Sequence, residues 1–316
     1  MSVPRFSLIV TSYNQRQFIK DAIDSATALR TPTREIIVVD DGSTDGSQAV
    51  LREYGDAIEL VPLSINRGKG GARNCGAAIA RGDYLVFLDG DDVFLPWALD
   101  VYERIAEAKS PELILVPMLW FEGPVPTASP SDGPGSIRFV EYDDYLRKDR
   151  AFGVSASSVI IRREAFEKVS GWGNLPVMQD QELMIRLGTV GRTIHVLSPP
   201  TIGHRKHAGQ TVWTVPPYLD AMVELIRKER SGGFPGGRAR RLERAALLGA
   251  LAFFWSKRAF KARLYWSAVK LFAGTWPMQL WASVRRLHVI MTGRRPPEEL
   301  MLDRGSCDAL PMVDLR

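Results

Sequence analysis

Three aspartates occupy four consecutive positions of the sequence: Asp89, Asp91 and Asp92. They follow five apolar residues, 84–88, a run typical of a strand buried on both faces of a parallel sheet. Carboxylates this close repel one another unless a cation lies among them, and ligands bind where strands of an open α/β sheet end. We therefore predict a site for Mg²⁺ or Mn²⁺. The alternative is a polar turn before a helix near Pro96, which explains one aspartate better than three.

The composition is that of a globular protein. The chain has 316 residues, of which 45% are hydrophobic and 24% charged, enough for one large α/β domain and an appendage. Only two cysteines, Cys75 and Cys307, are present, which favours a reducing cytoplasm over a disulfide framework. The first residues run straight into a strand-like segment, so we expect no signal peptide. The longest apolar run, 245–255, is shorter than the roughly 18 residues that span a bilayer.

The net charge of +5 is unevenly distributed. Residues 227–295 hold sixteen Lys or Arg against two glutamates, a balance of +14, so the remainder of the chain sums to −9. The segment also carries aromatic residues between its basic clusters, and no nucleic-acid-binding motif accompanies them. We predict that this segment lies on an anionic membrane surface; the alternative is that its aromatics pack on protein and leave a solvated basic face.

The elements that must position the aspartates alternate between strand and helix. Strands are predicted at 6–10, 35–39, 58–62 and 84–88, and helices at 18–29, 48–54 and 72–80. This rhythm predicts a parallel sheet with crossover helices, and a Gly-rich basic loop at 66–71 opens the third helix. Later come a strand at 157–161, helices at 163–169 and 180–187, and a strand at 193–197. Helices are expected from 218 on, with a linker at 231–237, and residues 296–316 show no periodicity.

Taken in order, the motifs resemble those of family 2 glycosyltransferases with a GT-A fold. The matching pieces are Thr11-Ser-Tyr-Asn14, Val39-Asp-Asp-Gly-Ser-Thr-Asp45, Asn66-Arg-Gly68 with Ala72-Arg-Asn74, Asp89-Gly-Asp91, Gln179-Asp180 and His204-Arg-Lys-His207. The resemblance covers about residues 4–215. It implies an α/β nucleotide-sugar-binding domain with a mostly parallel sheet over 1–217, whose donor half is about 1–100 and whose acceptor and catalytic half is about 101–217. A helical segment, 218–295, and a tail, 296–316, follow.

The resemblance implies a nucleotide-sugar donor, most simply a UDP-sugar. The residues that it assigns to the donor are Thr11, Tyr13, Asn14, Asp40, Asp41, Lys69, Arg73 and Asp89. An aromatic face at Tyr13 can stack on uracil, and a carboxylate at Asp41 can accept the uracil N3 proton. The alternatives are rim packing for Tyr13 and simple turn chemistry for Asp40 and Asp41. Lys69 and Arg73 flank a helix start that favours anions, or form a solvated basic loop.

The resemblance also implies a metal site and a catalytic base. Asp91 is the expected ligand of Mn²⁺ or Mg²⁺, with Asp89 and His207 nearby, and Asp180 is the expected general base; a helix cap is its alternative role. Gln179 stands where the family has a glutamate, which leaves any role of that carboxylate in doubt. Gln179 and Trp172 are candidate acceptor contacts, and Trp172 is equally compatible with the core.

The expected function is an inverting, metal-dependent transfer of one sugar per encounter to a glycan or lipid-linked acceptor of a bacterial surface polysaccharide. The chain lacks the Gln-x-x-Arg-Trp motif of processive synthases. One alternative is a sugar-phosphate nucleotidyltransferase, which requires glycines after the first strand; residues 11–14 contain none. Another is a non-catalytic scaffold. A Rossmann dehydrogenase lacks support because no G-x-G-x-x-G follows the first strand. We expect a cytoplasmic protein at the inner face of the membrane, without a nucleic-acid partner.

Overall fold

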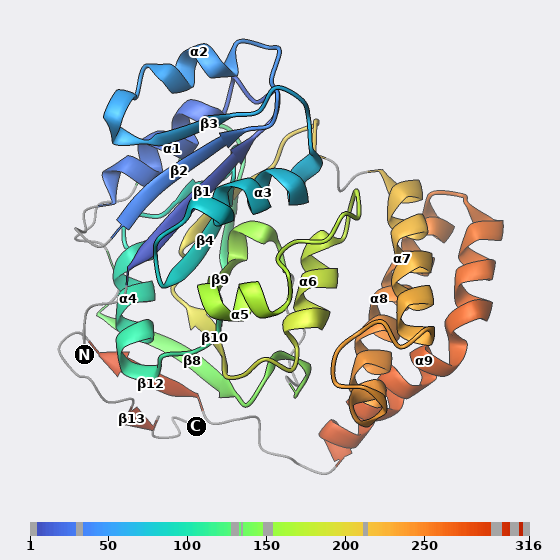
Figure 1. The fold of residues 1–316 in the computed structure, drawn as a ribbon. Coiled ribbons are helices and arrows are strands. Elements are labelled where there is room, and N and C mark those ends of the chain that lie inside the picture. Colours follow the sequence, from blue (N-terminus) through green and yellow to red (C-terminus); the bar gives the residue numbers. More distant parts are fainter. Residues whose placement is uncertain are drawn as a thin grey trace.

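The computed structural model describes residues 5–29, 34–127, 133, 135–147, 154–210, 214–291, 299–303 and 310–311. Within them, ten strands form one sheet in the order β13-β12-β8-β10-β6-β9-β4-β1-β2-β3, and β5-β11-β7 form a smaller sheet (Figure 1). The strands are β1 Phe6–Ser12, β2 Arg34–Asp40, β3 Glu59–Pro62, β4 Tyr84–Asp89, β5 Val93–Phe94, β6 Leu113–Leu115, β7 Met118–Phe121, β8 Ser136–Tyr142, β9 Val159–Arg162, β10 Thr193–Ser198, β11 Ile202–Arg205, β12 Leu300–Asp303 and β13 Leu310–Pro311. The α-helices are α1 Ile19–Ala28, α2 Ser47–Arg52, α3 Gly68–Ile79, α4 Ala98–Lys109, α5 Arg163–Lys168, α6 Gln179–Leu187, α7 Val215–Arg230, α8 Arg241–Lys261 and α9 Tyr265–Met291.

Strands β1 to β4 form the parallel half of the sheet, as the strand and helix rhythm predicts. Their side chains alternate between two cores: Leu8 and Val10 pack with α1 and α4, whereas Ile9 packs with α3 and α6. Helices therefore cover both faces, which requires continuous apolar strands. The register sets Thr11 beside Asp89 and Ser12 beside Asp40, so the residues that follow these strands meet at one edge of the sheet.

The remainder of the sheet is mixed: β10 and β6 pair in parallel, and the other pairs are antiparallel. Strand β9 runs antiparallel between β4 and β6, and β8 and β12 are antiparallel to their neighbours. An apolar run shows that a strand is buried but not in which direction its neighbours run. Within the tail, whose sequence shows no periodicity, Leu300–Asp303 form β12 and pair with β8.

Helix α3 begins at Gly68, four residues before the predicted start, so most of the Gly-rich loop is its first turn. Two tight approaches explain the glycines. A Cβ on Gly70 would lie 2.4 Å from the carbonyl oxygen of Gly173, and one on Gly76 would lie 2.5 Å from the Ile9 side chain. Small residues thus let α3 pack closely on the sheet and on the loop that precedes α6.

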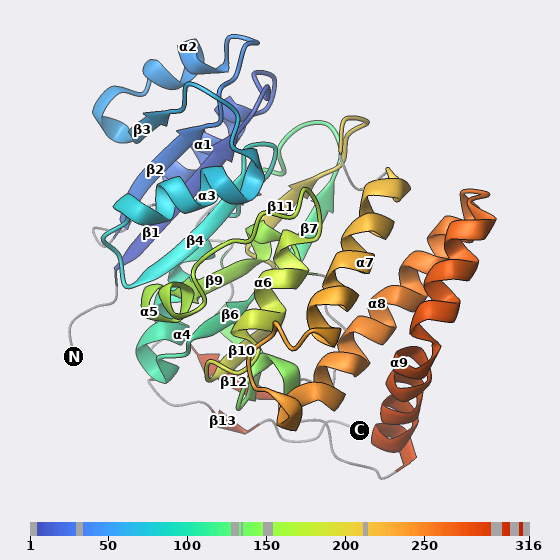
Figure 2. The same cartoon turned by 45° about the vertical axis from the view of Figure 1, so that its right-hand side comes forward.

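Helices α7, α8 and α9 lie side by side beyond α6, as Figures 1 and 2 show. Their shared core contains Met222, Leu248 and Leu271, and a buried ion pair joins Arg244 Nε to Glu229 Oε2 at 2.6 Å. A Cβ on Gly249 would lie 2.1 Å from the carbonyl oxygen of Met278, so α8 and α9 cross at very short range. Of the helices in the described part of the chain, none combines the length and apolarity needed to cross a membrane.

Candidate active site

A cavity of about 2220 Å³ opens at the edge where β1, β2 and β4 end. It reaches from Tyr13 and Asp41 on the sheet side to Tyr218 and Trp255 on the C-terminal helices. Strands β1 and β4, the turn after β2, the start of α6 and the C-terminal helices therefore contribute to one site. A volume this large exceeds the 300–1,000 Å³ usual for one small-molecule ligand.

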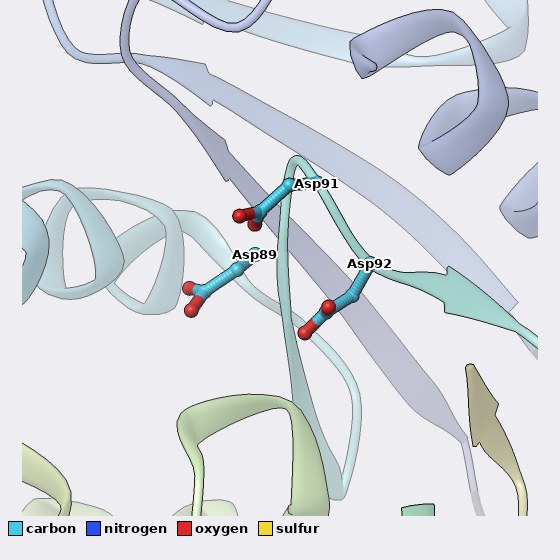
Figure 3. Close-up of side chains that lie close together, drawn as sticks. All are labelled: Asp89, Asp91 and Asp92. Carbon is cyan, nitrogen blue, oxygen red and sulfur yellow. The ribbon is translucent and has the colours of Figure 1, made fainter. Parts of the chain in front are cut away.

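Asp89, Asp91 and Asp92 lie together, as predicted, at the end of β4 (Figure 3). One carboxylate oxygen of each falls within 4.8 Å of the others. Asp91 Oδ2 lies 2.8 Å from His207 Nε2, which brings together two predicted metal residues that are far apart in the sequence. Both residues line the cavity, as does Asp89. Carboxylate oxygens and an imidazole nitrogen are a donor set that fits Mn²⁺ or Mg²⁺.

Asp92 is fully buried and, unlike Asp89 and Asp91, does not line the cavity. Its carboxylate accepts hydrogen bonds from Ser157 Oγ at 2.7 Å and from the Arg205 backbone N–H at 3.2 Å, and His204 Nδ1 lies 2.9 and 3.0 Å from its two oxygens. Burial raises the pKa of Asp92. Burial lowers the pKa of His204, but the hydrogen bond and charge of Asp92 outweigh this effect and raise it. These contacts fix the turn that presents Asp91.

Arg73 lies at the centre of the site rather than on a solvated loop. Its Nη2 is 2.5 Å from Asp89 Oδ1, its Nη1 donates to Gln179 Oε1 at 3.2 Å, and its guanidinium lies 4.6 Å from the centre of the Trp172 ring. Burial alone would raise the pKa of Asp89, but the charges of Arg73 and Lys69 lower it to about 2. Arg73 thus ties the end of β4 to the start of α6.

Trp172 does not face the cavity. Its side chain is 2% exposed and packs edge-on against Phe87, beneath Arg73. The hypothesis that Trp172 stacks on an acceptor sugar is therefore wrong, because a ring buried on this scale has no free face. An indole that supports an arginine and one that stacks on a sugar look identical in sequence.

Asp180 lies at the start of α6, on the cavity wall, as expected of a general base. Its Oδ1 accepts the backbone N–H of Gln181 at 2.8 Å. Burial raises the pKa of Asp180 despite this hydrogen bond. The charge of Asp180 in turn adds to burial in raising the pKa values of Tyr145 and Tyr218, so both tyrosines lie near it. Neither tyrosine was a candidate from the sequence, since they come from distant segments without a motif.

The predicted base-binding side of the cavity holds Thr11, Tyr13, Asn14 and Asp41. Tyr13 is 48% exposed, and Asn14, with φ +52°, accepts the backbone N–H of Thr44 at 2.8 Å through Oδ1. Asp41 accepts the Arg67 backbone N–H at 2.6 Å, and burial raises its pKa against the effect of this bond.

Asp40 and Asp41 lie on opposite sides of the turn after β2. Asp40 is fully buried and does not line the cavity; its Oδ2 accepts hydrogen bonds from the Ser43 backbone and from Gln48. The donor-binding role predicted for Asp40 is wrong, and the turn chemistry considered as its alternative is what the structure shows. Lys69 and Gln179, predicted to contact the donor and the acceptor respectively, both line the cavity.

The arrangement of an α/β sheet, a carboxylate cluster at its central strand end and a facing carboxylate on α6 is that of a GT-A fold. Solved structures confirm the fold prediction. S. aureus TarS residues 1–349 in complex with UDP-GlcNAc superposes with a TM-score of 0.57 over 98% of this chain and all of that chain, at 15% identity. The mannosyltransferase PcManGT from Pyrobaculum calidifontis, in complex with GDP-Man and Mn²⁺, gives 0.51 over 93% and 89%, at 18% identity.

The sequence comparison gives the family. Residues 7–170, just over half of the chain, match the model of glycosyl transferase family 2, and the chain belongs to this family. The succinoglycan biosynthesis protein ExoO from Rhizobium meliloti is 42% identical over 95 residues, which are 30% of this chain and 27% of that protein. The chain spans less than half the length of the first such relatives. Family membership confirms the predicted resemblance and favours it over the nucleotidyltransferase and dehydrogenase alternatives.

Proposed function

We propose that the chain is an inverting, metal-dependent glycosyltransferase that moves one sugar per encounter from a UDP-sugar to a glycan or lipid-linked acceptor of a bacterial surface polysaccharide. One observation carries this proposal: Asp91 with His207 and Asp180 with Tyr218 line the same cavity. The relative in succinoglycan synthesis supports the polysaccharide context. The neighbour with UDP-GlcNAc supports a uridine donor, for which Tyr13 and Asp41 offer a stacking face and a hydrogen-bond acceptor.

In this proposal Asp91, His207 and Asp89 hold Mn²⁺ or Mg²⁺, which when bound supplies positive charge for the leaving diphosphate. Asp180 accepts the proton of the acceptor hydroxyl. The acceptor oxygen forms its bond to the anomeric carbon as the bond from that carbon to the diphosphate oxygen breaks, on the opposite face, which inverts the configuration. A raised pKa makes Asp180 a stronger base than an ordinary aspartate.

The proposal extends to a peripheral position at the inner face of the cell membrane. Exposed aromatic side chains on α8 and α9 include Phe260, Trp266 and Trp276, and the same helices carry Lys257, Lys261 and Lys270. Aromatic rings and cations on one pair of helices suit an anionic lipid interface. No nucleic-acid partner is part of this proposal.

Thermal unfolding with a panel of nucleotide sugars tests the proposal. A UDP-sugar is expected to stabilise the wild-type chain more with Mn²⁺ than with EDTA, because bound ligand favours the folded state. Asp91→Asn should lose the metal-dependent part of this stabilisation and the transfer activity, whereas Asp180→Asn should lose activity alone. Stabilisation by GDP-sugars but not by UDP-sugars would show that the donor is a GDP-sugar. Stabilisation by neither class would contradict the proposed glycosyltransferase function.

A further inference from the structure

The cavity continues past Asp180 into an apolar wing that a nucleotide sugar does not require. Its walls come from the loop before α6 and from α8, and include Leu175, Val177, Leu247 and Leu251. A donor is a polar molecule whose phosphates and sugar need hydrogen-bond partners, which these side chains do not offer. The wing therefore suits a second ligand.

One face of α8 forms most of this wall. Ala246, Leu247, Ala250, Leu251 and Phe254 all line the cavity, at offsets of one, four, five and eight residues along the helix. That spacing places them in one stripe, because residues three and four apart are neighbours on a helix surface. Two alanines in the stripe have small side chains, which leave a groove between the larger leucine and phenylalanine side chains.

One end of the groove lies between the catalytic base and the molecular surface. There Tyr218 lines the cavity, has its pKa raised in part by the charge of Asp180, and stacks on Trp255 with ring centres 4.1 Å apart. The ring of Phe254, 5.4 Å from that of Trp255, is 50% exposed at the same end. The guanidinium of Arg258 lies 5.7 Å from the centre of the Phe254 ring, and Lys257 follows on the same turn. This end thus combines an exposed aromatic ring with cations.

We infer that this groove binds the hydrocarbon chain of an amphipathic acceptor drawn from an anionic lipid surface, with the hydroxyl to be glycosylated held at Asp180. The inference rests on the proposed function and names the acceptor class for that site. An apolar stripe that begins beside the base suits a chain attached to the reacting group, because burying each methylene removes it from water. The cations at this end match the phosphates of the surface from which the chain enters.

Binding of alkyl phosphates to the full chain tests this inference without the transfer reaction. Decyl phosphate below its micelle concentration is expected to bind wild-type protein at least tenfold more tightly than butyl phosphate does, by calorimetry. Ala250→Trp, at an exposed position of the groove, should abolish this preference. Ala273→Trp, exposed on α9 outside the cavity, is the matched control and should retain it.

Binding of UDP with Mn²⁺ is measured on the same samples and should be unchanged in both variants. If the wild-type chain did not bind UDP, the proposed UDP-sugar donor would be wrong. The preference for the longer alkyl phosphate would then stand as an independent result. Equal affinity for decyl and butyl phosphate would overturn the inference and assign the groove to a protein segment or a compact aromatic group. An Ala250→Trp variant with the wild-type preference would overturn it too.

Discussion

Asp180 combines a chemical role with a cost to stability. Burial raises its pKa above the ordinary value of 3.8, so the ionised carboxylate is less favourable in the folded chain than in the unfolded one. The folded chain binds the proton more tightly, and stability therefore falls as pH rises through this pKa. The penalty is complete above the folded-state pKa and absent below the unfolded value.

Asp180→Asn should therefore separate activity from stability. We expect the transfer rate at saturating substrate to fall roughly a hundredfold, the usual contribution of a general base. At neutral pH the variant should unfold at a higher temperature than the wild type, and this difference should vanish as pH falls below 3.8. Paired thermal melts across pH check the second part. A variant that is less stable than wild type at neutral pH would contradict the burial argument.

Arg73 provides a second test at a single position. Lysine keeps the charge but cannot contact Asp89 and Gln179 at once or stack flat on Trp172. We expect Arg73→Lys to fold, to lose transfer activity about tenfold or more, and to melt at a lower temperature. Arg52→Lys, at an exposed position on α2, is the control and should match the wild type in both assays. Equal activity in both variants would show that the bridge to α6 is dispensable.

The candidate residues show what can be predicted from residue type and order. Asp91 and His207 were predicted together because their motifs occur in family order, and their side chains meet at 2.8 Å. Asp40 was assigned to the donor on the same basis, whereas Trp172, outside these motifs, was weighed as a sugar contact or as core; both side chains are buried. The difference lies in the direction of a side chain around a turn, which composition does not specify. The neighbours of Asp180, Tyr145 and Tyr218, belong to no motif at all.

At the scale of elements, the crossing of α8 and α9 depends on Gly249. A Cβ there would meet the Met278 carbonyl oxygen at 2.1 Å, and backbone cannot yield as a flexible side chain can. Gly249→Ala should therefore lower stability by about 1–3 kcal/mol, the typical cost of overpacking. Chemical denaturation measures this change.

Gly274→Ala on α9 is the matched control for this substitution. A Cβ at Gly274 meets nothing within 4 Å, so alanine there should be neutral or should raise stability by about 0.5–1 kcal/mol through its helix preference. If both variants lost the same stability, the loss would reflect glycine itself rather than the helix crossing.

Elements were predicted well where local pattern determines them. The strands β1 to β4 and the helices between them follow from apolar runs and from helical spacing. The antiparallel insertion of β9 and the return of Leu300–Asp303 to the sheet were missed, because both depend on pairing with distant strands. The start of α3 was missed because glycine ordinarily weakens a helix, and here close packing requires it.

At the scale of the whole molecule, the uneven charge predicts how the chain meets a membrane. Trp266 is 79% exposed on α9, and Lys261 and Lys270 are exposed on the same pair of helices. The 316-residue chain should co-sediment with anionic liposomes and should be released by high salt. Replacing both lysines with glutamine should weaken binding roughly thirtyfold, at about 1 kcal/mol for each charge.

A control with the same net charge tests the location of the surface. Lys168→Gln with Arg52→Gln removes two positive charges from the catalytic domain. Its liposome binding should equal that of the wild type. If both double variants lost the same liposome affinity, net charge alone would govern sedimentation. If the chain bound neutral and anionic liposomes equally, lipid charge would have no part in it.

Strand β12 has a consequence for the order in which the protein is made. Leu302 is 2% exposed in the core beneath α4, and its carbonyl oxygen accepts Arg104 Nη2 at 2.6 Å, across 198 positions of sequence. A ribosome must therefore complete α7, α8 and α9 before the edge of β8 acquires this partner. Until then the growing chain exposes an unpaired strand edge, which favours association with other chains. The time needed to synthesise α7, α8 and α9 thus sets how long the edge of β8 stays unpaired.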